Sequence, residues 1–510
     1  MKILALSPNY KYHQDLLESL LAKGIETEFA TSHKPESESI NRPFYAKHKT
    51  KLINGKDFYN LNKLQKIVPA DAPALDKEKL EYFESVERDF YTLSDRYSYF
   101  PKSFRYRKRL FRAGLRYWLD FYAKNKIDAL FSICTPHNFP DYLAFHAAKY
   151  LGIKTLLTTD AMVNDHVLLL EDYRQSFKVP EDFMAGKSDN DIKASLKPSF
   201  AKSAFSESNE ITMAKQWNDQ MLKLKGVNAQ VAKTDKLEPV KKFAKRATKF
   251  LSFEMFKPKF KATFAMNGEF SDNTRRLIRI QSGRRLKRLK KAYEDLAVYP
   301  DYSKKFAYFA MHLNPERTTQ PEAEVFEDHL LAIEILSKSV PKDWLVYVKE
   351  NPAQYGRKLN LVNGRHYRDA SDYAEFTRLS NVRLLRQDVK TADLIKNATL
   401  VASLKGTVGW ERINSGRACL IFANAWYSAC RAAYRVNDLK SCKAAIKTIL
   451  AKTISEVETD RLKFFAYMQD NIIQGSMGGH HNLKIAVTPY ETMVDSLADS
   501  IIARFNAGSA

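Results

Sequence analysis

The chain has 510 residues, of which 45% are hydrophobic and 12% aromatic, and it carries a formal net charge of +23 at pH 7. This length exceeds what one hydrophobic core usually organises, and the apolar content excludes a disordered chain, so we expect two large lobes. No apolar run approaches the roughly 20 residues that a membrane-spanning helix needs. A soluble or peripheral membrane protein is therefore expected.

The first residues and the cysteines favour a cytoplasmic protein. The apolar part of residues 1–9 is too short for the core of a signal peptide, and no small-residue cleavage pattern follows it. The four cysteines, Cys134, Cys419, Cys430 and Cys442, include no Cys-x-x-Cys pair. Reduced thiols in a cytoplasmic protein fit this pattern better than a disulfide framework or a structural zinc site.

The N-terminal part predicts alternating strands and helices, which begin with a βαβ unit. In chain order these elements are strand Lys2–Leu6, helix Gln14–Ala22, strand Ile25–Ala30, strand Ile127–Cys134, helix Asp141–Tyr150 and strand Ile153–Thr158. Residues from about 76 to 126 read as helical and are rich in Tyr, Phe, Arg and Lys, which indicates a helical insertion rather than a binding surface. We expect residues 1–240 to form a Rossmann-like first lobe.

A strongly basic segment follows this lobe. Residues 241–291 contain 17 Lys and Arg residues but only Glu254, Glu269 and Asp272 as acids, a net charge of +14. Phenylalanines interleave with the cations, which suits an amphipathic surface on anionic lipid. A solvated face between the lobes is an equally expected interpretation of this segment. Binding of nucleic acid is not favoured, because no nucleic-acid-binding motif accompanies the charge. We expect residues 241–300 to be a basic linker that faces the membrane.

The second lobe, expected over residues 301–485, again alternates strands with helices. The predicted strands are Phe306–Met311, Trp344–Val348, Val382–Leu385, Thr399–Ala402 and Cys419–Phe422, and the predicted helices are Glu322–Lys338, Thr391–Asn397 and Thr407–Ser415. This order predicts a parallel sheet covered on both faces. A last helix, Thr488–Arg504 within residues 486–510, begins with a Thr-Pro pair suited to a cap and first position, and is expected to cross back to the first lobe. The predicted fold class is α/β, with two doubly wound lobes facing across a cleft.

The end of strand Thr399–Ala402 predicts a phosphate site. Ser403, Gly406 and Thr407 form a small-residue turn before a helix, where backbone N–H groups and the positive helix end favour an anion. An ordinary helix cap is the alternative for this turn alone. Glu411 lies one turn into the helix, where a carboxylate accepts hydrogen bonds from a ribose, although a surface Glu favoured by the helix dipole is equally expected.

Four ordered blocks in the second lobe resemble the capsule polysaccharide biosynthesis family, which includes bacterial Kdo transferases. The blocks are Asn314-Pro315-Glu316-Arg317-Thr318-Thr319-Gln320-Pro321, the stretch from Val346 to Arg357, Gly406-Thr407-Val408-Gly409-Trp410-Glu411 and Ala425-Trp426-Tyr427. The resemblance covers residues 306–427 well and the first lobe only in outline. It implies a GT-B glycosyltransferase whose second lobe binds a nucleotide sugar and whose first lobe binds the acceptor.

Two proline motifs carry the donor expectation within this resemblance. Relatives that use CMP-Kdo flank the donor with a Gln-Pro motif and a His-Pro motif, which are Gln320-Pro321 and Asn351-Pro352 in this chain. Asparagine replaces the frequent histidine, so this position offers neutral donors and an acceptor but no protonation chemistry. Such a site implies a different donor or a weaker enzyme. Lys349 and Arg357 are candidates to neutralise donor charge, although each alone reads as a solvated cation.

The catalytic base is expected from the first lobe, because the acceptor hydroxyl must lose a proton across the cleft. Asp160 lies at the end of strand Ile153–Thr158 and is the first candidate, followed by Asp165 and His166 in the next loop. A loop acid is more often a turn or cap residue, which is the alternative for all three. No metal or other cofactor is expected, since His480 and His481 are adjacent and point apart.

These observations predict a cytoplasmic enzyme, peripheral at the inner face of the membrane. It would transfer a sugar, with Kdo or another ulosonic acid first, from a CMP-linked or other nucleotide-sugar donor to a glycan or glycolipid acceptor of a capsular or lipopolysaccharide-type polymer. Two alternatives remain. One is a nucleotide-sugar epimerase or hydrolase on the same fold, and the other is a non-catalytic nucleotide- or glycan-binding protein of the capsule machinery.

Overall fold

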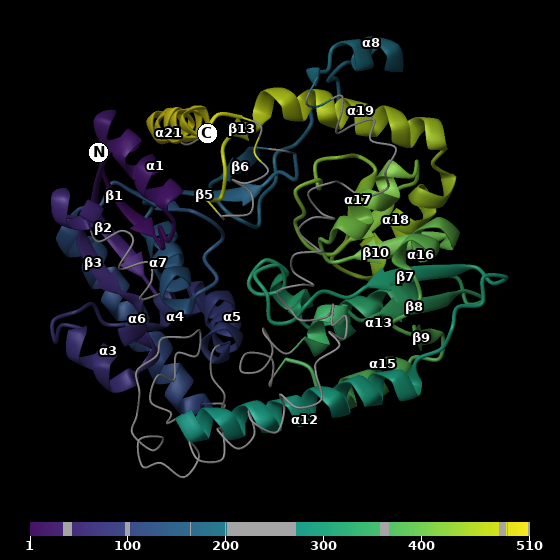
Figure 1. Cartoon of the computed structure of the whole chain (residues 1–510), viewed down its shortest axis with the longest axis horizontal. Coiled ribbons are helices and arrows are strands. Elements are labelled where there is room, and N and C mark those ends of the chain that lie inside the picture. The colour runs from purple at the N-terminus through teal and green to yellow at the C-terminus, as the bar shows by residue number, and fades with distance from the viewer. Residues whose placement is uncertain are drawn as a thin grey trace, which may run out of the picture.

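A computed structural model describes most of the chain and gives two lobes, each built on its own sheet (Figure 1). The described residues are 1–33, 43–96, 102–163, 165–198, 200, 272–356, 367–478, 486 and 488–507. Arg357, the pair His480-His481 and the larger part of the basic segment, residues 241–271, lie outside them.

The first lobe contains a seven-stranded sheet in the order β13-β6-β5-β4-β1-β2-β3. The strands are β1 (Lys2–Leu6), β2 (Glu26–Ser32), β3 (Lys51–Asn54), β4 (Ala129–Ser132), β5 (Lys154–Asp160), β6 (His166–Leu170) and β13 (Ile473–Gln474). The five strands from β1 to β5 run parallel, and β6 and β13 add antiparallel pairs at one edge. The central strands β1 and β4 are apolar and almost wholly buried, as expected of a parallel sheet covered on both faces.

Helices complete the first lobe, and the expected insertion forms one wall of its core. The helices are α1 (Lys11–Ala22), α3 (Leu61–Ile67), α4 (Lys77–Tyr82), α5 (Glu84–Asp95), α6 (Phe104–Asn125), α7 (Phe139–Tyr150) and α8 (Asp189–Ala194), with the short turn η1 (Gly55–Tyr59). The aromatic residues Phe90, Phe111 and Trp118 of α5 and α6 are fully buried, in one core cluster with residues of β1, β4 and α7. The aromatic content of this segment therefore serves packing.

The second lobe contains a six-stranded, wholly parallel sheet in the order β12-β11-β10-β7-β8-β9. The strands are β7 (Phe306–Ala310), β8 (Leu345–Lys349), β9 (Val382–Leu384), β10 (Leu400–Ser403), β11 (Cys419–Ile421) and β12 (Ala433–Arg435). The connecting helices are η3 (Glu324–Glu327), α13 (His329–Ser339), η4 (Pro352–Tyr355), α15 (Ala370–Thr377), α16 (Thr391–Asn397), α17 (Thr407–Asn414) and α18 (Leu439–Ala451).

The single helix expected over Glu322–Lys338 is wrong in its first part. The structure has a short turn, η3, and then a separate helix that begins at His329. The carboxylate of Asp328 accepts the Leu330 backbone N–H at 3.0 Å and caps α13. Apolar spacing continues across this break, so the cap residue rather than the periodicity decides where the helix begins.

The end of the chain returns to the first lobe. Helix α19 (Ile454–Asn471) leads from the second lobe to β13, and α21 (Tyr490–Asn506) packs beside α1 (Figure 1). The expected Thr488 cap is wrong, because Pro489 occupies the cap position and no side chain caps α21. The Thr488 backbone N–H instead donates to Asp165 at 2.8 Å.

The strand order of the second sheet creates a crevice. From β7 the chain moves to β8 and β9 on one side, and it then returns to β10, β11 and β12 on the other side. The loops after β7 and β10 therefore leave the carboxyl edge of the sheet in opposite directions, which is where open α/β sheets bind ligands. Two parallel-rich sheets in two lobes confirm the predicted α/β, GT-B-like fold class.

Candidate functional site

A cavity of about 990 Å³ lies at this crevice and reaches the first lobe. The second lobe supplies the loops that follow β7, β8 and β10, together with one side of α16 and of α17. The first lobe supplies Thr159, Asp160 and Met162 at the end of β5. A volume near the upper limit for small-molecule pockets leaves room for a ligand with several groups.

The cavity brings together most of the residues that the sequence singles out. Eight of them line it: Asp160, Lys349, Asn351, Pro352, Ser403, Gly406, Thr407 and Glu411. Gln320, Pro321, Asp165 and His166 are described but do not line it, and Arg357 lies outside the described residues. The residues at strand ends meet because the sheet is parallel, in agreement with the alternation of strands and helices in the sequence.

The start of α17 is an uncapped helix N-terminus that faces the cavity. Gly406 holds the cap position, and no side chain caps the N–H groups of the first turn. A Cβ at Gly406 would lie 3.0 Å from Ser403 Oγ and 3.1 Å from His312 Cε1, so only glycine fits here without displacing a neighbour. Thr407 Oγ1 donates to Glu411 Oε1 at 3.1 Å. Uncapped amides and the positive end of the helix suit an anionic group.

The block Ala425-Trp426-Tyr427 fixes this helix start from behind. The Tyr427 hydroxyl donates to the Gly406 carbonyl at 2.6 Å, and Tyr427 is fully buried. A Cβ at Gly409 would lie 2.2 Å from the same hydroxyl, so the glycine lets Tyr427 approach the helix axis. The sequence block that resembles the capsule family therefore includes residues that orient the first turn of α17.

Two cations that the sequence analysis did not select stand at the cavity wall. Arg317, in the loop after β7, and Lys405, in the turn before α17, both pair with buried Glu322, at 3.3 Å and 2.5 Å. Burial by itself would raise the pKa of Glu322, but Lys405 and Arg317 outweigh it and lower the pKa to about 2. The two cations thus share one carboxylate, and Asp160 and Glu316 also act on Arg317. Arg317 follows β7 and Lys405 follows β10, and this position after a strand is the sequence signal that could have pointed to them.

The ammonium group of Lys349 is engaged within the protein. Lys349 lines the cavity, but its ammonium group donates to the Val389 backbone carbonyl, and burial lowers the pKa of this lysine. Its charge is thus partly committed to holding the loop after β9. Arg317 and Lys405 are better placed to meet an anion at the start of α17.

His312 is another cavity residue that sequence reasoning missed. It lies two residues after β7, its backbone N–H donates to His329 Nε2 at 3.0 Å, and its ring lies against Gly406. Burial and the nearby Lys405 charge lower the pKa of His312 to about 4. The imidazole is therefore neutral at pH 7 and offers one donor and one acceptor.

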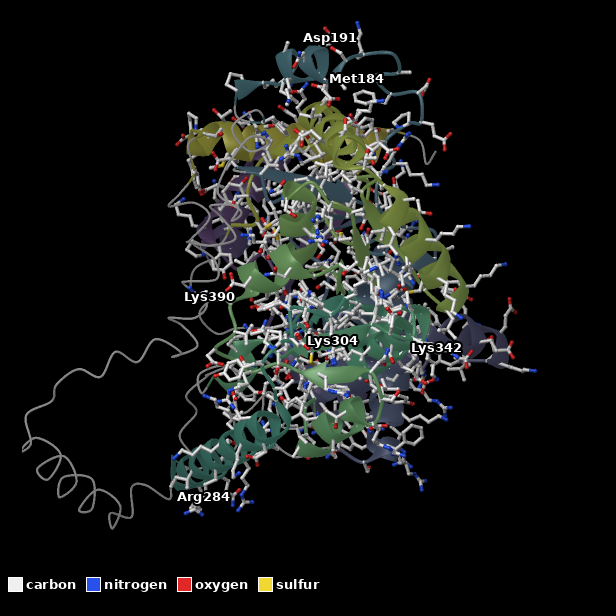
Figure 2. All side chains as sticks on the ribbon, turned by 90° about the vertical axis from the view of Figure 1, so that its right-hand side faces the viewer. Met184, Asp191, Arg284, Lys304, Lys342 and Lys390 are labelled. Carbon is white, nitrogen blue, oxygen red and sulfur yellow. The ribbon has the colours of Figure 1, made fainter. Side chains whose placement is uncertain are left out.

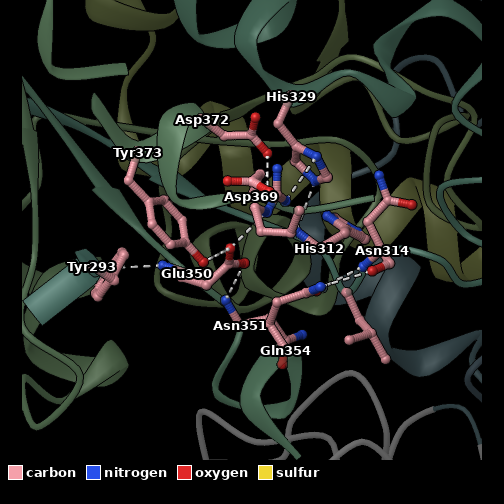
Figure 3. A network of polar contacts seen from close by, with 12 residues as sticks. Tyr293, His312, Asn314, His329, Glu350, Asn351, Gln354, Asp369, Asp372 and Tyr373 are labelled. Carbon is pink, nitrogen blue, oxygen red and sulfur yellow. Dashed lines mark hydrogen bonds and ion pairs between the residues drawn. The ribbon is translucent and has the colours of Figure 1, made fainter. Parts of the chain in front are cut away.

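A buried polar network supports the loop after β8 (Figure 3). The Glu350 carboxylate pairs with Arg368 Nε at 2.9 Å, and it accepts the Asn351 backbone N–H and the Tyr373 hydroxyl, each at 2.9 Å. The Glu350 N–H in turn donates to the Tyr293 hydroxyl at 3.1 Å. Burial raises the pKa of Glu350, and the Arg368 charge opposes this rise. A buried network of this kind holds the loop backbone in one conformation.

Asn351 is fixed by this loop. Its side-chain oxygen accepts the Ala353 backbone N–H at 3.0 Å and caps the short turn η4. The carboxamide oxygen is therefore used within the protein, and the amide nitrogen is the group left to meet a ligand. A donor at this position fits an oxygen atom of the ligand.

Gln320 acts at the boundary of the lobes rather than in the cavity. Its amide nitrogen donates to Asn314 Oδ1 at 3.1 Å and to Glu327 Oε2 at 2.7 Å, and the side chain is buried. Its backbone carbonyl accepts a bond from Arg96 of the first lobe at 3.4 Å. The Gln320-Pro321 motif thus shapes the long loop after β7 and joins it to the first lobe.

Asp160 is the acid that faces the second lobe. It is the last residue of β5, half-buried, and it lines the cavity opposite the loops of the second sheet. Burial raises the pKa of this carboxyl group, and the Arg317 guanidinium opposes the rise. A carboxylate with a raised pKa is a stronger base than an exposed aspartate, which suits proton abstraction.

Asp165 and His166 lie beyond the cavity and hold the returning chain. Asp165 has a φ of 59°, its carboxylate accepts the Thr488 N–H, and its carbonyl accepts the Gly475 N–H at 2.8 Å. His166 pairs with Gln474 of β13 and lies edge-on to Phe200, with ring centroids 5.3 Å apart. These contacts tie β6 to the segment that precedes α21.

Within the described ranges, no group of three His, Cys, Asp or Glu side chains is placed to hold a metal ion. No helix of the same ranges combines the length and the hydropathy required to cross a bilayer.

Comparisons with known proteins give structural matches only. No family model matches the sequence, and no curated protein sequence matches it. Similar solved structures include the UDP-GlcNAc 2-epimerase from Methanocaldococcus jannaschii (9% identity, TM-score 0.23, covering 91% of this chain and 99% of that one). Others are Thermosulfurimonas dismutans KpsC, a beta Kdo 2,4 transferase (10%, 0.27, 72% and 88%), and a glycosyltransferase from Rickettsia africae ESF-5 (9%, 0.25, 99% and 97%).

Asp165→Ala is expected to lower the free energy of unfolding by about 2 kcal/mol or more, because it removes a buried acceptor and strains a backbone with positive φ. Asp165→Asn keeps an acceptor and tolerates this backbone, so its loss should be smaller. Urea unfolding of both variants measures the difference. Equal stability of both variants and the wild-type protein would contradict the assigned contacts.

Proposed function

We propose that this protein is a GT-B glycosyltransferase of cell-surface polysaccharide biosynthesis, of the capsular or lipopolysaccharide type. It transfers a sugar from a nucleotide-sugar donor, with CMP-Kdo or another CMP-linked ulosonic acid first, to a glycan or glycolipid acceptor. The observation that carries this proposal is the cavity at the switch point of the second sheet, where the uncapped start of α17 faces Asp160 of the first lobe. The resemblance of residues 306–427 to the capsule family supplies the sugar chemistry.

The donor phosphate is assigned to the first turn of α17. No side chain caps its N–H groups, Gly406 leaves room for close approach, and Lys405 stands beside them. Glu322 pairs with both Lys405 and Arg317 and so orients both cations. Fixed dipoles and cations of this kind stabilise the charge that develops on a leaving phosphate. Glu411, one turn further, is assigned to the ribose hydroxyls.

The acceptor reacts from the first-lobe side. Asp160 takes the proton of the acceptor hydroxyl, while the oxygen of that hydroxyl forms a bond to the anomeric carbon of the donor sugar. The bond from that carbon to the phosphate oxygen breaks, and the nucleotide leaves with the electron pair. Arg317 affects both ends of this step, because its charge acts on Asp160 and on Glu322.

Asn351 assists binding without proton transfer. Its amide nitrogen is a neutral donor, and Lys349 beside it keeps the neighbouring loop in place. Donor binding at this position should therefore not depend on a titration near neutral pH, in contrast to a site with histidine.

Calorimetric titration with CMP, UDP and GDP tests the donor site. We expect at least one to bind, and Lys405→Gln to weaken its binding by about 10- to 100-fold, the effect of losing one charge-assisted hydrogen bond. Lys443→Gln on the exposed face of α18 is the matched control and should bind as the wild-type protein does. The unfolding midpoint of each variant is measured alongside. Binding of none of the three nucleotides would reject the donor assignment.

Asp160→Asn tests the base. Turnover should fall by about 10²-fold or more while nucleotide affinity stays unchanged. In the wild-type protein, burial raises the Asp160 pKa, so the rate should fall on acidification at a higher pH than for an ordinary aspartate. Unchanged turnover removes Asp160 from this role. Donor consumption without acceptor would instead support an epimerase or hydrolase.

The basic segment is proposed to hold the enzyme at the cytoplasmic face of the membrane, and its described part is α12 (Asp272–Leu296). The inner side of α12 buries apolar residues, whereas its outer side exposes Leu277, Ile280 and then Arg284, with Lys287 and Arg288 beyond. Figure 2 shows Arg284 on α12 at the outer edge of the molecule. Exposed aliphatic residues followed by cations suit an anionic lipid surface.

Replacing Arg284, Lys287 and Arg288 together by Gln should reduce sedimentation with vesicles that contain phosphatidylglycerol. Added salt should weaken the binding of the wild-type protein, because exposed charges are screened. Vesicles of phosphatidylcholine alone are the control. Equal binding to both kinds of vesicle, or none at low salt, would contradict a contact through these charges.

A further inference from the structure

Helix α6 of the first lobe carries an unbalanced charge. Residues 102–119 contain seven Lys and Arg residues and no Asp or Glu. The sequence predicts this segment to be a helical insertion, and the donor and acceptor chemistry uses none of it. Its inner side is core, because Leu110, Phe111, Leu115 and Trp118 are almost fully buried.

Three of the seven cations have structural partners. They donate to backbone carbonyls of neighbouring segments: Lys102 to Tyr59 at 3.0 Å, Arg107 to Tyr91 at 3.0 Å, and Arg116 to Ala72 at 3.0 Å and Pro73 at 3.2 Å. Each of these bonds fixes a loop or a helix end against α6. These three cations are therefore explained by the fold.

The other four cations, Arg105, Lys108, Arg109 and Arg112, have no hydrogen bond or ion pair with the described part of the chain. Arg105, Arg109 and Arg112 are exposed and follow one another at spacings of four and three, so they lie on one face, opposite the buried side. Like charges at this spacing repel one another in the free protein. An anionic partner would remove this repulsion.

Some surface cations of the described chain are instead balanced by acids on their own helix. On α6 itself Lys124 pairs with Asp120 at 2.8 Å, and on α12 Lys291 pairs with Asp295 at 2.7 Å. Arginines predominate among the unbalanced cations of α6, and a guanidinium binds phosphate oxygens through two parallel hydrogen bonds. The face formed by Arg105, Lys108, Arg109 and Arg112, here termed the α6 face, is thus suited to phosphate groups.

An exposed aromatic residue borders the α6 face. Phe104, the first residue of the helix, is 59% exposed, and the Lys108 ammonium lies 5.9 Å from the centre of its ring. An aromatic side chain at the end of a row of cations is typical of helices that lie in the headgroup region of a membrane. Among phosphate-bearing partners, this composition favours a lipid surface.

The α6 face neighbours the basic helix of the other lobe. The Phe104 ring packs on Tyr91 of α5, with centroids 5.1 Å apart, and the Thr92 carbonyl next to it accepts the Tyr367 hydroxyl. The adjacent Arg368 carbonyl accepts a bond from Arg285 of α12 at 3.3 Å. Helix α5 therefore links the start of α6 to the short stretch 367–368, which also contacts α12.

We propose that the α6 face is a second membrane contact, which binds the phosphates of anionic lipids through Arg105, Lys108, Arg109 and Arg112. The proposal rests on the membrane association proposed for α12 and extends it to the first lobe. Two linked contacts bind more tightly than either alone, and they also fix the orientation of the molecule on the surface. One contact on each lobe would hold the cleft at a constant angle to a lipid-linked acceptor.

The test compares two triple variants of the full chain, each with three exposed cations replaced by Gln. R105Q/R109Q/R112Q alters the α6 face, and K440Q/K443Q/K447Q alters the exposed side of α18 as the matched control. Sedimentation is measured with vesicles of phosphatidylcholine, with and without phosphatidylglycerol. We expect the α6 variant to bind anionic vesicles about 100-fold more weakly and the α18 variant to change little.

Two further measurements separate the possible failures. Nucleotide titration of the α6 variant should match that of the wild-type protein. If neither protein binds a nucleotide, the proposed function is overturned while the vesicle result still stands. Binding of duplex DNA is measured in parallel. An α6 variant that binds anionic vesicles as well as the α18 variant does, or that loses only DNA binding, would overturn the lipid contact.

Discussion

The site depends on one topological constraint, the reversal of strand order between β7 and β10. Parallel strands deliver all their carboxyl ends to one edge, and the reversal leaves a gap there that no connecting helix fills. The loop after β7 brings His312 and Arg317 to this gap, and the turn after β10 brings Lys405 and Gly406. Residues almost a hundred positions apart become neighbours without any long-range motif in the sequence.

Two buried carboxylates hold the loops around this gap. Glu322 joins the β7 loop to the turn before α17 through Arg317 and Lys405, and Glu350 joins the β8 loop to Arg368. A buried carboxylate is costly to leave unpaired, so each one selects the loop conformations that supply its cation. The pairs add specificity of shape rather than much net stability. The cations needed by a charged ligand are held in position before it arrives.

Strand ends and small-residue turns are the parts of the site that can be predicted from the sequence. Ser403, Gly406 and Thr407 are predictable because a strand, a turn and a helix are local, and Asp160 is predictable because it lies at a strand end. Lys405 and Arg317 are not predictable in this way, since they matter through sharing Glu322, a contact that spans 83 residues from Glu322 to Lys405. Gln320 was selected by resemblance, yet its amide bonds within its own loop. Caps such as Asp328 were missed because apolar periodicity ignores them.

The two lobes are electrically coupled through Arg317. Its guanidinium pairs with Glu322 in the second lobe and also acts on Asp160 of the first lobe across the cavity. A ligand phosphate near Lys405 would compete with Glu322 for Arg317 and change the electric field at Asp160. Under the proposed function, charge at the donor end would be felt at the acceptor end, because both share one buried cation in a medium of low dielectric constant. The basicity of Asp160 would then depend on whether the proposed donor is bound.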